Sequence, residues 1–314
     1  MSGARSILKR QARALSVDSQ VTSTASTLAP LALWRDRTGA FSWLRAAALA
    51  VAVAPALPLV WRIATADLGP RPLTEVSHVT GLWAIRLLAV TLAVTPVLEL
   101  MRQPRLVAAR RILGVSVFVW MAAHFVVFVA DKSFNPIVVA HELIARVYLL
   151  IGTVALIMLA ALAATSTDAA VRRLGAQRWK RLHRLVYAIT LLGLVHFFMQ
   201  SKLDVTEPTA MAGIFALLGL LRLPRRFGRA LTPALALALA ATTAALVAIV
   251  EAGYYALAMG APFDALIAAD FSLDLGVRPC WAPMIVGVAF AVVGLASRLD
   301  MRRRNAARPS VRRA

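Results

Sequence analysis

The chain has 314 residues, enough for one large domain or two small ones. Apolar residues make up 60% of it and charged residues only 16%, and the apolar residues fall into long blocks. This composition excludes a disordered chain and argues against an ordinary soluble enzyme. The formal charge of +20 is also typical of nucleic-acid-binding proteins. The single Cys280 excludes an internal disulfide and a cysteine cluster for zinc or an iron–sulfur centre.

The chain begins with a polar, basic stretch at 1–42, which we expect to be a tail and not a cleaved signal peptide. Eight apolar runs of membrane-spanning length then predict helices at about 43–63, 80–100, 112–130, 143–164, 182–200, 207–221, 231–257 and 281–298. The sixth run is short, so we expect it to tilt or to lie in a locally thinned bilayer. The predicted fold is an all-α integral membrane bundle that ends in a short basic tail.

The basic residues are distributed unevenly among the segments between the predicted spans. The seven segments between these spans carry 1, 4, 1, 5, 1, 4 and 1 Lys or Arg, and both termini are basic. The positive-inside tendency places the basic segments and both termini on the cytoplasmic side of the membrane, and most acidic residues fall on the outer face. Because the basic residues are split among short loops, they form no continuous groove for a nucleic acid.

Two of the five histidines lie inside spans at matched depth. His124 follows the predicted start of the third span by twelve residues and His196 follows that of the fifth by fourteen, which puts them about 18 and 21 Å from the inner boundary. Two level imidazoles on neighbouring helices can supply both axial ligands of a haem iron. Unrelated histidines hydrogen-bonded to backbone carbonyls are an equally good explanation of the spacing alone.

His183 begins the fifth span, about 20 Å below His196. It is a candidate ligand of a second, inner haem or a neighbour of a flavin site. On an ideal straight helix, however, His183 and His196 would lie on different faces. Arg110 and Arg111 occupy the same level at the start of the third span. They suit a propionate or a phosphate, or they act as cytoplasmic anchors.

Four further residues are candidates for the outer part of the membrane. His78 precedes the second span and His141 lies in an outer loop, and either is explained by simple solvation. Arg86 lies two turns into the second span, where it either pairs with a haem propionate or snorkels to the headgroups. Glu251 inside the seventh span is a candidate proton or quinone site, or a hydrogen-bonded structural carboxyl.

The stretch TSTDAAVRRLGAQRWKRLHRLVYAITLLGLVHFF, from Thr165 to Phe198, closely resembles the fifth-span motif of the MsrQ (YedZ) family. The motifs EVSHVTG, QPRLVAARRILG and HELIARVYLLIG support the resemblance, which covers about 65–227 and extends to the wider ferric-reductase-like transmembrane superfamily. It implies a haem-binding core at 43–227, followed by a two-helix extension at 228–299 that the family lacks and a tail at 300–314.

The resemblance implies a haem-binding subunit in the bacterial inner membrane, part of the periplasmic methionine sulfoxide reductase system. It implies b-type haem with His124, His183 and His196 as the associated histidines, and FMN at residues that it does not identify. Electrons would come from a quinol or a cytosolic flavin reductase and would pass outward to a molybdopterin sulfoxide reductase subunit. His141 does not fall on a ligand position of the family.

The residues also leave alternatives to this function. Because the chain has no Gly-rich dinucleotide fingerprint and only a short tail after the eighth span, we expect its electrons to come from another molecule. A stand-alone ferric or quinone reductase is a second possibility within redox chemistry. A transporter or assembly factor with structural histidines is a third, from another class.

Overall fold

The computed structural model describes residues 33–35, 38–202, 204–272, 274 and 276–306. The chain divides into two compact units, 1–53 and 54–314. In the first unit, α2 spans Trp43–Val53 and an isolated bridge joins Arg35 to Phe41. Most of the basic tail predicted at 1–42, and the last eight residues of the tail predicted at 300–314, lie outside the described residues.

The second unit is built from helices throughout its described part. Its first half contains α3 (Ala56–Ala64), α4 (Pro72–Met101), the 3₁₀ turn η2 (Pro104–Leu106), α5 (Val107–Asp131), α6 (Pro136–Ala145) and α7 (Val147–Ala164). Its second half contains α8 (Asp168–Leu174), α9 (Ala176–His183), α10 (Leu185–Ser201), α11 (Thr206–Leu220), α12 (Leu223–Arg226), α13 (Pro233–Met259), α14 (Phe263–Phe271) and α15 (Trp281–Ala306).

Eight helical stretches in the described part of the chain are long and apolar enough to cross a membrane. They correspond one to one to the eight predicted spans, so the prediction of an all-α membrane bundle is confirmed. The boundaries differ by eight residues at the start of α4, which begins at Pro72 instead of about residue 80, and at the end of α15, which extends to Ala306 instead of about residue 298. The fifth span also differs, because it consists of α9 and α10 with a break at Arg184.

Local sequence signals explain several helix starts. Pro72, Pro136 and Pro233 stand in the first turn of α4, α6 and α13, where a missing backbone N–H costs nothing. The Asn135 side chain accepts hydrogen bonds from two backbone N–H groups of α6, and the Thr232 hydroxyl accepts one from α13. These caps fix the starts of α6 and α13.

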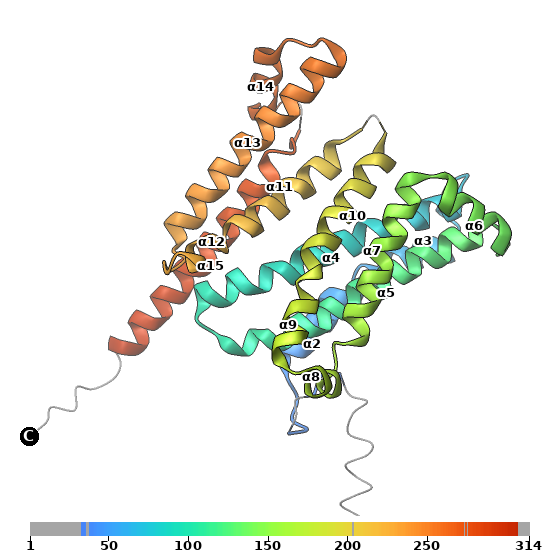
Figure 1. Cartoon of the computed structure of the whole chain (residues 1–314). Coiled ribbons are helices and arrows are strands. Elements are labelled where there is room, and N and C mark those ends of the chain that lie inside the picture. Colours follow the sequence, from blue (N-terminus) through green and yellow to red (C-terminus); the bar gives the residue numbers. More distant parts are fainter. Residues whose placement is uncertain (1–32, 36–37, 203, 273, 275, 307–314) are drawn as a thin grey trace, which may run out of the picture. The chain divides into compact units, whose positions relative to one another are not determined.

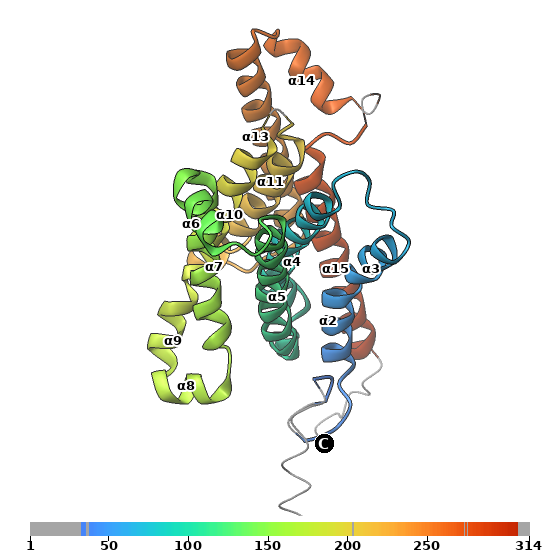
Figure 2. The ribbon, with the colours of Figure 1, turned by 90° about the vertical axis from the view of Figure 1, so that its right-hand side faces the viewer.

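Within the second unit, helices pack largely in pairs. α4 packs mainly on α5, α7 on α10 and α13 on α15, and α11 contacts α4, α10, α13 and α15. Figure 1 shows α13 and α15 side by side, and Figure 2 shows the short helices α8 and α9 at one end of α7. The pairs α4–α5 and α7–α10 carry the membrane histidines.

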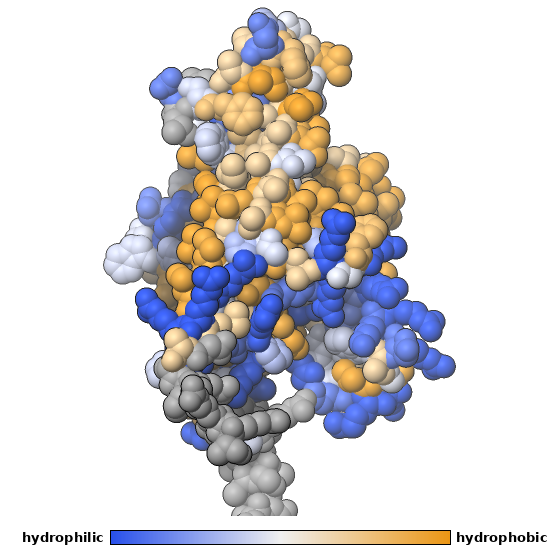
Figure 3. Space-filling view, turned by 90° about the vertical axis from the view of Figure 1, so that its left-hand side faces the viewer, coloured by the Kyte–Doolittle hydropathy of each residue, from blue (hydrophilic) through white to orange (hydrophobic). Residues whose placement is uncertain are grey.

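The helices expose many large apolar side chains. Leu257 is 92% exposed and Ile144 78%, which would be costly in water. On the face shown in Figure 3, hydrophobic side chains cover a broad area and hydrophilic ones gather toward one end of it. Such a surface is suited to contact with lipid, as expected for a multi-pass membrane protein.

Candidate functional site

Two imidazoles from different helix pairs approach each other inside the bundle. His124 lies on α5 and His196 on α10, and both are partly buried. Their ring centres are 6.4 Å apart and the ring planes cross at 86°. All five histidines lie in the described part of the chain, and this is the histidine pair that the fold brings into ring contact.

Each ring is anchored to the helix paired with its own. The Nδ1 atom of His124 lies 2.8 Å from the Ser77 carbonyl of α4, and the Nδ1 atom of His196 lies 2.7 Å from the Tyr148 carbonyl of α7. A carbonyl only accepts, so Nδ1–H must donate in both rings. In a neutral imidazole this leaves the Nε2 lone pair free to bind a metal, the arrangement usual for histidine ligands.

A glycine lies against each ring. A Cβ atom added to Gly81 would meet His124 Nδ1 at 3.0 Å, and one added to Gly152 would meet His196 Nδ1 at 2.8 Å. Each glycine follows the anchoring carbonyl by four residues, one helical turn. The two sites are therefore built alike, with a carbonyl to orient the ring and a glycine to admit it.

The separation of the rings suits one metal ion between them. An imidazole–metal bond of about 2 Å plus roughly 1 Å from nitrogen to ring centre, on each side, gives about 6 Å between centres. The observed separation is 6.4 Å. The two imidazoles could therefore hold a metal ion such as a haem iron between them.

His183 has different surroundings. Its ring stacks on Trp179 with centres 3.9 Å apart, and its Nε2 lies 3.2 Å from the Thr165 hydroxyl. That hydroxyl lies closest to the Ala161 carbonyl, at 2.7 Å, and when it donates its proton there, His183 Nε2–H donates to the hydroxyl. The ring then keeps its free lone pair on Nδ1, unlike His124 and His196, and it ends α9 about 20 Å from His196.

An arginine cluster lies near His183, at the basic end of the helices. Arg110 is exposed on α5 and acts electrostatically on both His183 and Arg222. Arg222 donates hydrogen bonds to the Leu218 and Leu92 carbonyls. Pro96 has no N–H to offer the Leu92 carbonyl one turn before it, so the arginine replaces the missing donor.

The other predicted residues are distributed around the opposite end. Arg86 contacts Glu207 at 3.3 Å and lies over the Trp83 ring, which gives the cation a protein partner. His78 is exposed on α4, directly after the anchoring residue Ser77. His141 is exposed on α6.

Glu251 of the predicted extension has an ionic partner far along the chain. Arg278 donates to its Oε1 atom at 2.7 Å and to Asp270 Oδ1 at 3.1 Å. Glu251 and Asp270 are 3% and 1% exposed, and the second oxygen of each carboxyl has no hydrogen-bond partner among the described residues. One cation thus serves two buried carboxyls, which fits a structural role and brings neither carboxyl to the histidine pair.

Sequence reasoning singled out the two histidines but not Gly81 and Gly152. Both glycines end motifs already noted, EVSHVTG and HELIARVYLLIG. A glycine inside a membrane helix was the available signal, because it permits close approach of another group. Gly193 lies three residues before His196, but a Cβ added to it would meet no described atom within 4 Å.

Several known proteins are similar to this chain in sequence. A family model described as ferric reductase like transmembrane component matches residues 80–194. The protein-methionine-sulfoxide reductase heme-binding subunit MsrQ of Rhodospirillum rubrum is 37% identical over 205 residues, which covers 62% of this chain and 95% of the relative. The chain belongs to the MsrQ family. Subunits of the same name from Ralstonia nicotianae and Xanthomonas axonopodis pv. citri are each 39% identical, over 56% and 51% of this chain and 83% and 73% of theirs.

Membership of the MsrQ family confirms the resemblance seen in the motifs. The ferric-reductase-like match includes His124, His183 and both ring-contacting glycines, and it ends two residues before His196. Since the alignment uses nearly all of the R. rubrum subunit but only 62% of this chain, this chain is considerably longer than that MsrQ. No solved structure matches the chain.

Proposed function

We propose that this chain is the haem-binding membrane electron-transfer subunit of a methionine sulfoxide reductase system. The names of its MsrQ relatives support a haem-binding role. The observation that carries the proposal is the His124–His196 pair, with ring centres 6.4 Å apart and both Nδ1 protons held by carbonyls. In this proposal the two Nε2 atoms would hold the iron of one b-type haem.

The proposed ligand set determines the chemistry. A haem with two histidine ligands supplies one-electron redox chemistry without an open position for oxygen. The chain itself orients both rings through the Ser77 and Tyr148 carbonyls and admits them beside Gly81 and Gly152.

The position of the pair favours delivery of electrons to the acidic side of the membrane, which we predict to be periplasmic. His124 lies seven residues before the end of α5 and His196 five before the end of α10, about 10 and 8 Å from these helix ends. The proposed acceptor is a periplasmic molybdopterin sulfoxide reductase subunit. The proposed donor is a quinol or a cytosolic flavin reductase that acts from the opposite side.

The other candidate residues receive secondary roles in this proposal. Arg86 and His78 lie toward the outer end of α4, where a haem propionate would be matched by a cation. Arg110 and His183 lie at the basic end and are proposed to border the entry of electrons, either at a second haem or at the FMN that the resemblance implies. His183 would bind iron through Nδ1, or through Nε2 after loss of its hydrogen bond to Thr165.

An optical spectrum of the purified protein tests the haem site. We expect sharp reduced α and Soret bands from the full chain after haem-replete expression, and loss of most haem in His124→Ala and His196→Ala. His141→Ala is the matched control, because His141 is exposed and lies on α6. A double variant of His124 and His196 that keeps full haem content and an unchanged spectrum would exclude the proposed ligands.

Anaerobic reduction separates the proposed system from a stand-alone reductase. A quinol and a reduced flavin reductase are added to the haem protein in separate trials, with and without the molybdopterin subunit. We expect one donor to reduce the haem, and methionine sulfoxide to reoxidise it only when that subunit is present. Reoxidation by a ferric chelate but not by the sulfoxide system would instead favour the stand-alone ferric reductase.

A further inference from the structure

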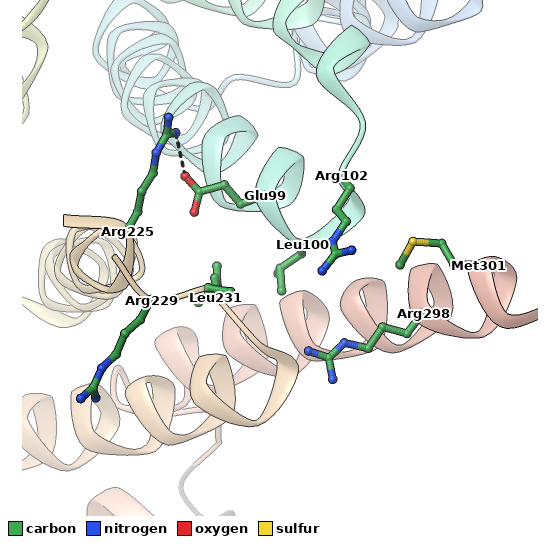
Figure 4. Close-up of a pocket in the computed structure, with 9 residues that line it drawn as sticks. Glu99, Leu100, Arg102, Arg225, Arg229, Leu231, Arg298 and Met301 are labelled. Carbon is green, nitrogen blue, oxygen red and sulfur yellow. Dashed lines mark hydrogen bonds and ion pairs between the residues drawn. The ribbon is translucent and has the colours of Figure 1, made fainter. Parts of the chain in front are cut away.

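A second site lies far from the histidine pair, at the basic end of the bundle. A pocket of about 260 Å³ opens where α4, the loop before α13 and α15 meet (Figure 4). Four arginines line it, from the end of α4, from α12, from the loop before α13 and from α15, together with a single glutamate. These residues are Arg102, Arg225, Arg229, Arg298 and Glu99.

The charge of the pocket is uneven. Arg225 pairs with Glu99 at 3.1 Å, whereas Arg102, Arg229 and Arg298 have no carboxylate partner in the described part of the chain. Four arginines and one glutamate leave a formal charge of +3 around a single hollow. Like charges around one pocket repel one another when no anion is bound. Guanidinium groups are also well suited to bind a phosphate, because each can donate paired hydrogen bonds to it.

The pocket is held in place by close packing beneath it. A Cβ atom added to Gly294 of α15 would meet Pro233 Cγ at 2.9 Å and Leu100 Cδ2 at 3.1 Å. The Ser297 hydroxyl donates to the Met101 carbonyl at 3.3 Å. These contacts join α15 to the end of α4, so that Arg298 lies beside the same hollow as Arg102 (Figure 4).

The size of the pocket limits the ligand. Sites for drug-sized ligands usually measure about 300–1,000 Å³, so 260 Å³ suits a phosphate group or a small headgroup better than a whole nucleotide. The hollow lies where two membrane-spanning stretches end, at Met101 and near Arg304. This is the level at which lipid phosphates are found.

Apolar side chains continue from the pocket along α15. Leu295 and Leu299 are 52% and 56% exposed, and Leu295 lies one helical turn before Arg298 on a neighbouring position of the same face. A ligand with a phosphate for the arginines and acyl chains for these leucines matches both features. We propose that the pocket binds the headgroup phosphate of an anionic phospholipid, which bridges α15 to α4 and α12.

Binding of defined lipids to the full chain in neutral detergent tests this site. The probes are short-chain phosphatidylglycerol, phosphatidylcholine of the same chain length, and inorganic phosphate. The pocket variant is Arg102→Gln with Arg298→Gln. The matched control is Arg226→Gln with Arg303→Gln, which removes the same charge from the same end of the molecule outside the pocket lining.

We expect wild-type protein to bind phosphatidylglycerol more tightly than the other two probes. The pocket variant should bind it roughly 25-fold more weakly, about fivefold for each arginine, while the control changes less than about threefold. An unchanged haem spectrum in both variants shows that the fold is intact. Equal weakening of phosphatidylglycerol binding in both variants would show that the pocket is not the binding site. Binding of inorganic phosphate as tight as that of phosphatidylglycerol would show that the ligand is not a lipid.

Discussion

The two ring-anchoring hydrogen bonds use backbone acceptors. The Ser77 and Tyr148 carbonyls accept from His124 and His196, so side-chain substitutions at the two anchoring residues leave the acceptors in place. The ring positions depend more strongly on the space beside them. That space is set by Gly81 and Gly152, where only a hydrogen stands between the helix backbone and the imidazole.

Gly81→Ala and Gly152→Ala are therefore expected to displace the histidines. An added methyl group would lie 3.0 Å from His124 Nδ1 or 2.8 Å from His196 Nδ1, and relieving such overpacking typically costs about 1–3 kcal/mol. We expect lower haem content or a shifted haem reduction potential, with the larger effect at Gly152. Haem-to-protein ratio and potentiometric titration measure both.

Two helical glycines elsewhere provide the control for this prediction. An alanine Cβ at Gly219 of α11 or Gly253 of α13 would meet no atom of the described residues within 4 Å. Both substitutions should leave the haem unchanged and raise helix stability by up to about 1 kcal/mol. Full haem content and an unaltered potential in Gly152→Ala would show that the ring is not confined as proposed.

At the scale of elements, one arginine connects three segments of the extension. Arg278, just before α15, holds Glu251 of α13 and Asp270 of α14. Burial raises the pKa of the Asp270 carboxyl above its ordinary value, and the hydrogen bond from Arg278 offsets part of that rise. The protonated form of Asp270 is thus favoured by folding, so its stabilising contribution is complete at low pH and is lost as the pH rises through its raised pKa.

Arg278→Gln should destabilise the protein markedly at neutral pH. It would leave two buried carboxyls without a cation, a change that costs about 3–5 kcal/mol in comparable cases. The loss should shrink in acid, where both carboxyls take up protons. Thermal unfolding in detergent at several pH values measures it.

Arg304→Gln is the matched control for Arg278, since its pair with Asp300 is 74% and 57% exposed. An exposed pair of this kind contributes roughly 0–1 kcal/mol, so little change is expected. A loss of stability in Arg278→Gln that is equal at low and neutral pH would contradict the charge argument and favour simple loss of packing.

At the scale of the molecule, the spans and the histidine pair were predictable because both depend on position along the chain. Apolar runs located eight membrane helices, and equal depth paired His124 with His196. The partners of Arg86 and Arg278 were not predictable, because they depend on which helices meet: Glu207 lies 121 residues from Arg86 and Glu251 lies 27 from Arg278. The role of Gly81 depends in the same way on α5 lying beside α4.

Orientation in the membrane stays a prediction, and the native thiol makes it simple to test. Cys280 is 1% exposed, and burial raises the pKa of its thiol to about 11. At neutral pH it stays protonated and should react slowly with maleimides. Cysteines introduced at exposed positions can therefore be labelled over a low background.

Ala169→Cys on α8 and Asp264→Cys on α14 report on opposite sides of the membrane, because an odd number of predicted spans separates them. The loop containing Ala169 is rich in Lys and Arg, which are retained in the cytoplasm, whereas the loop containing Asp264 is acidic. An impermeant maleimide added to intact spheroplasts should label Asp264→Cys and spare Ala169→Cys, and lysis should expose both. Labelling of Ala169→Cys alone before lysis would invert the topology and, with it, the proposed direction of electron transfer, because the His124–His196 pair would then lie near the cytoplasm.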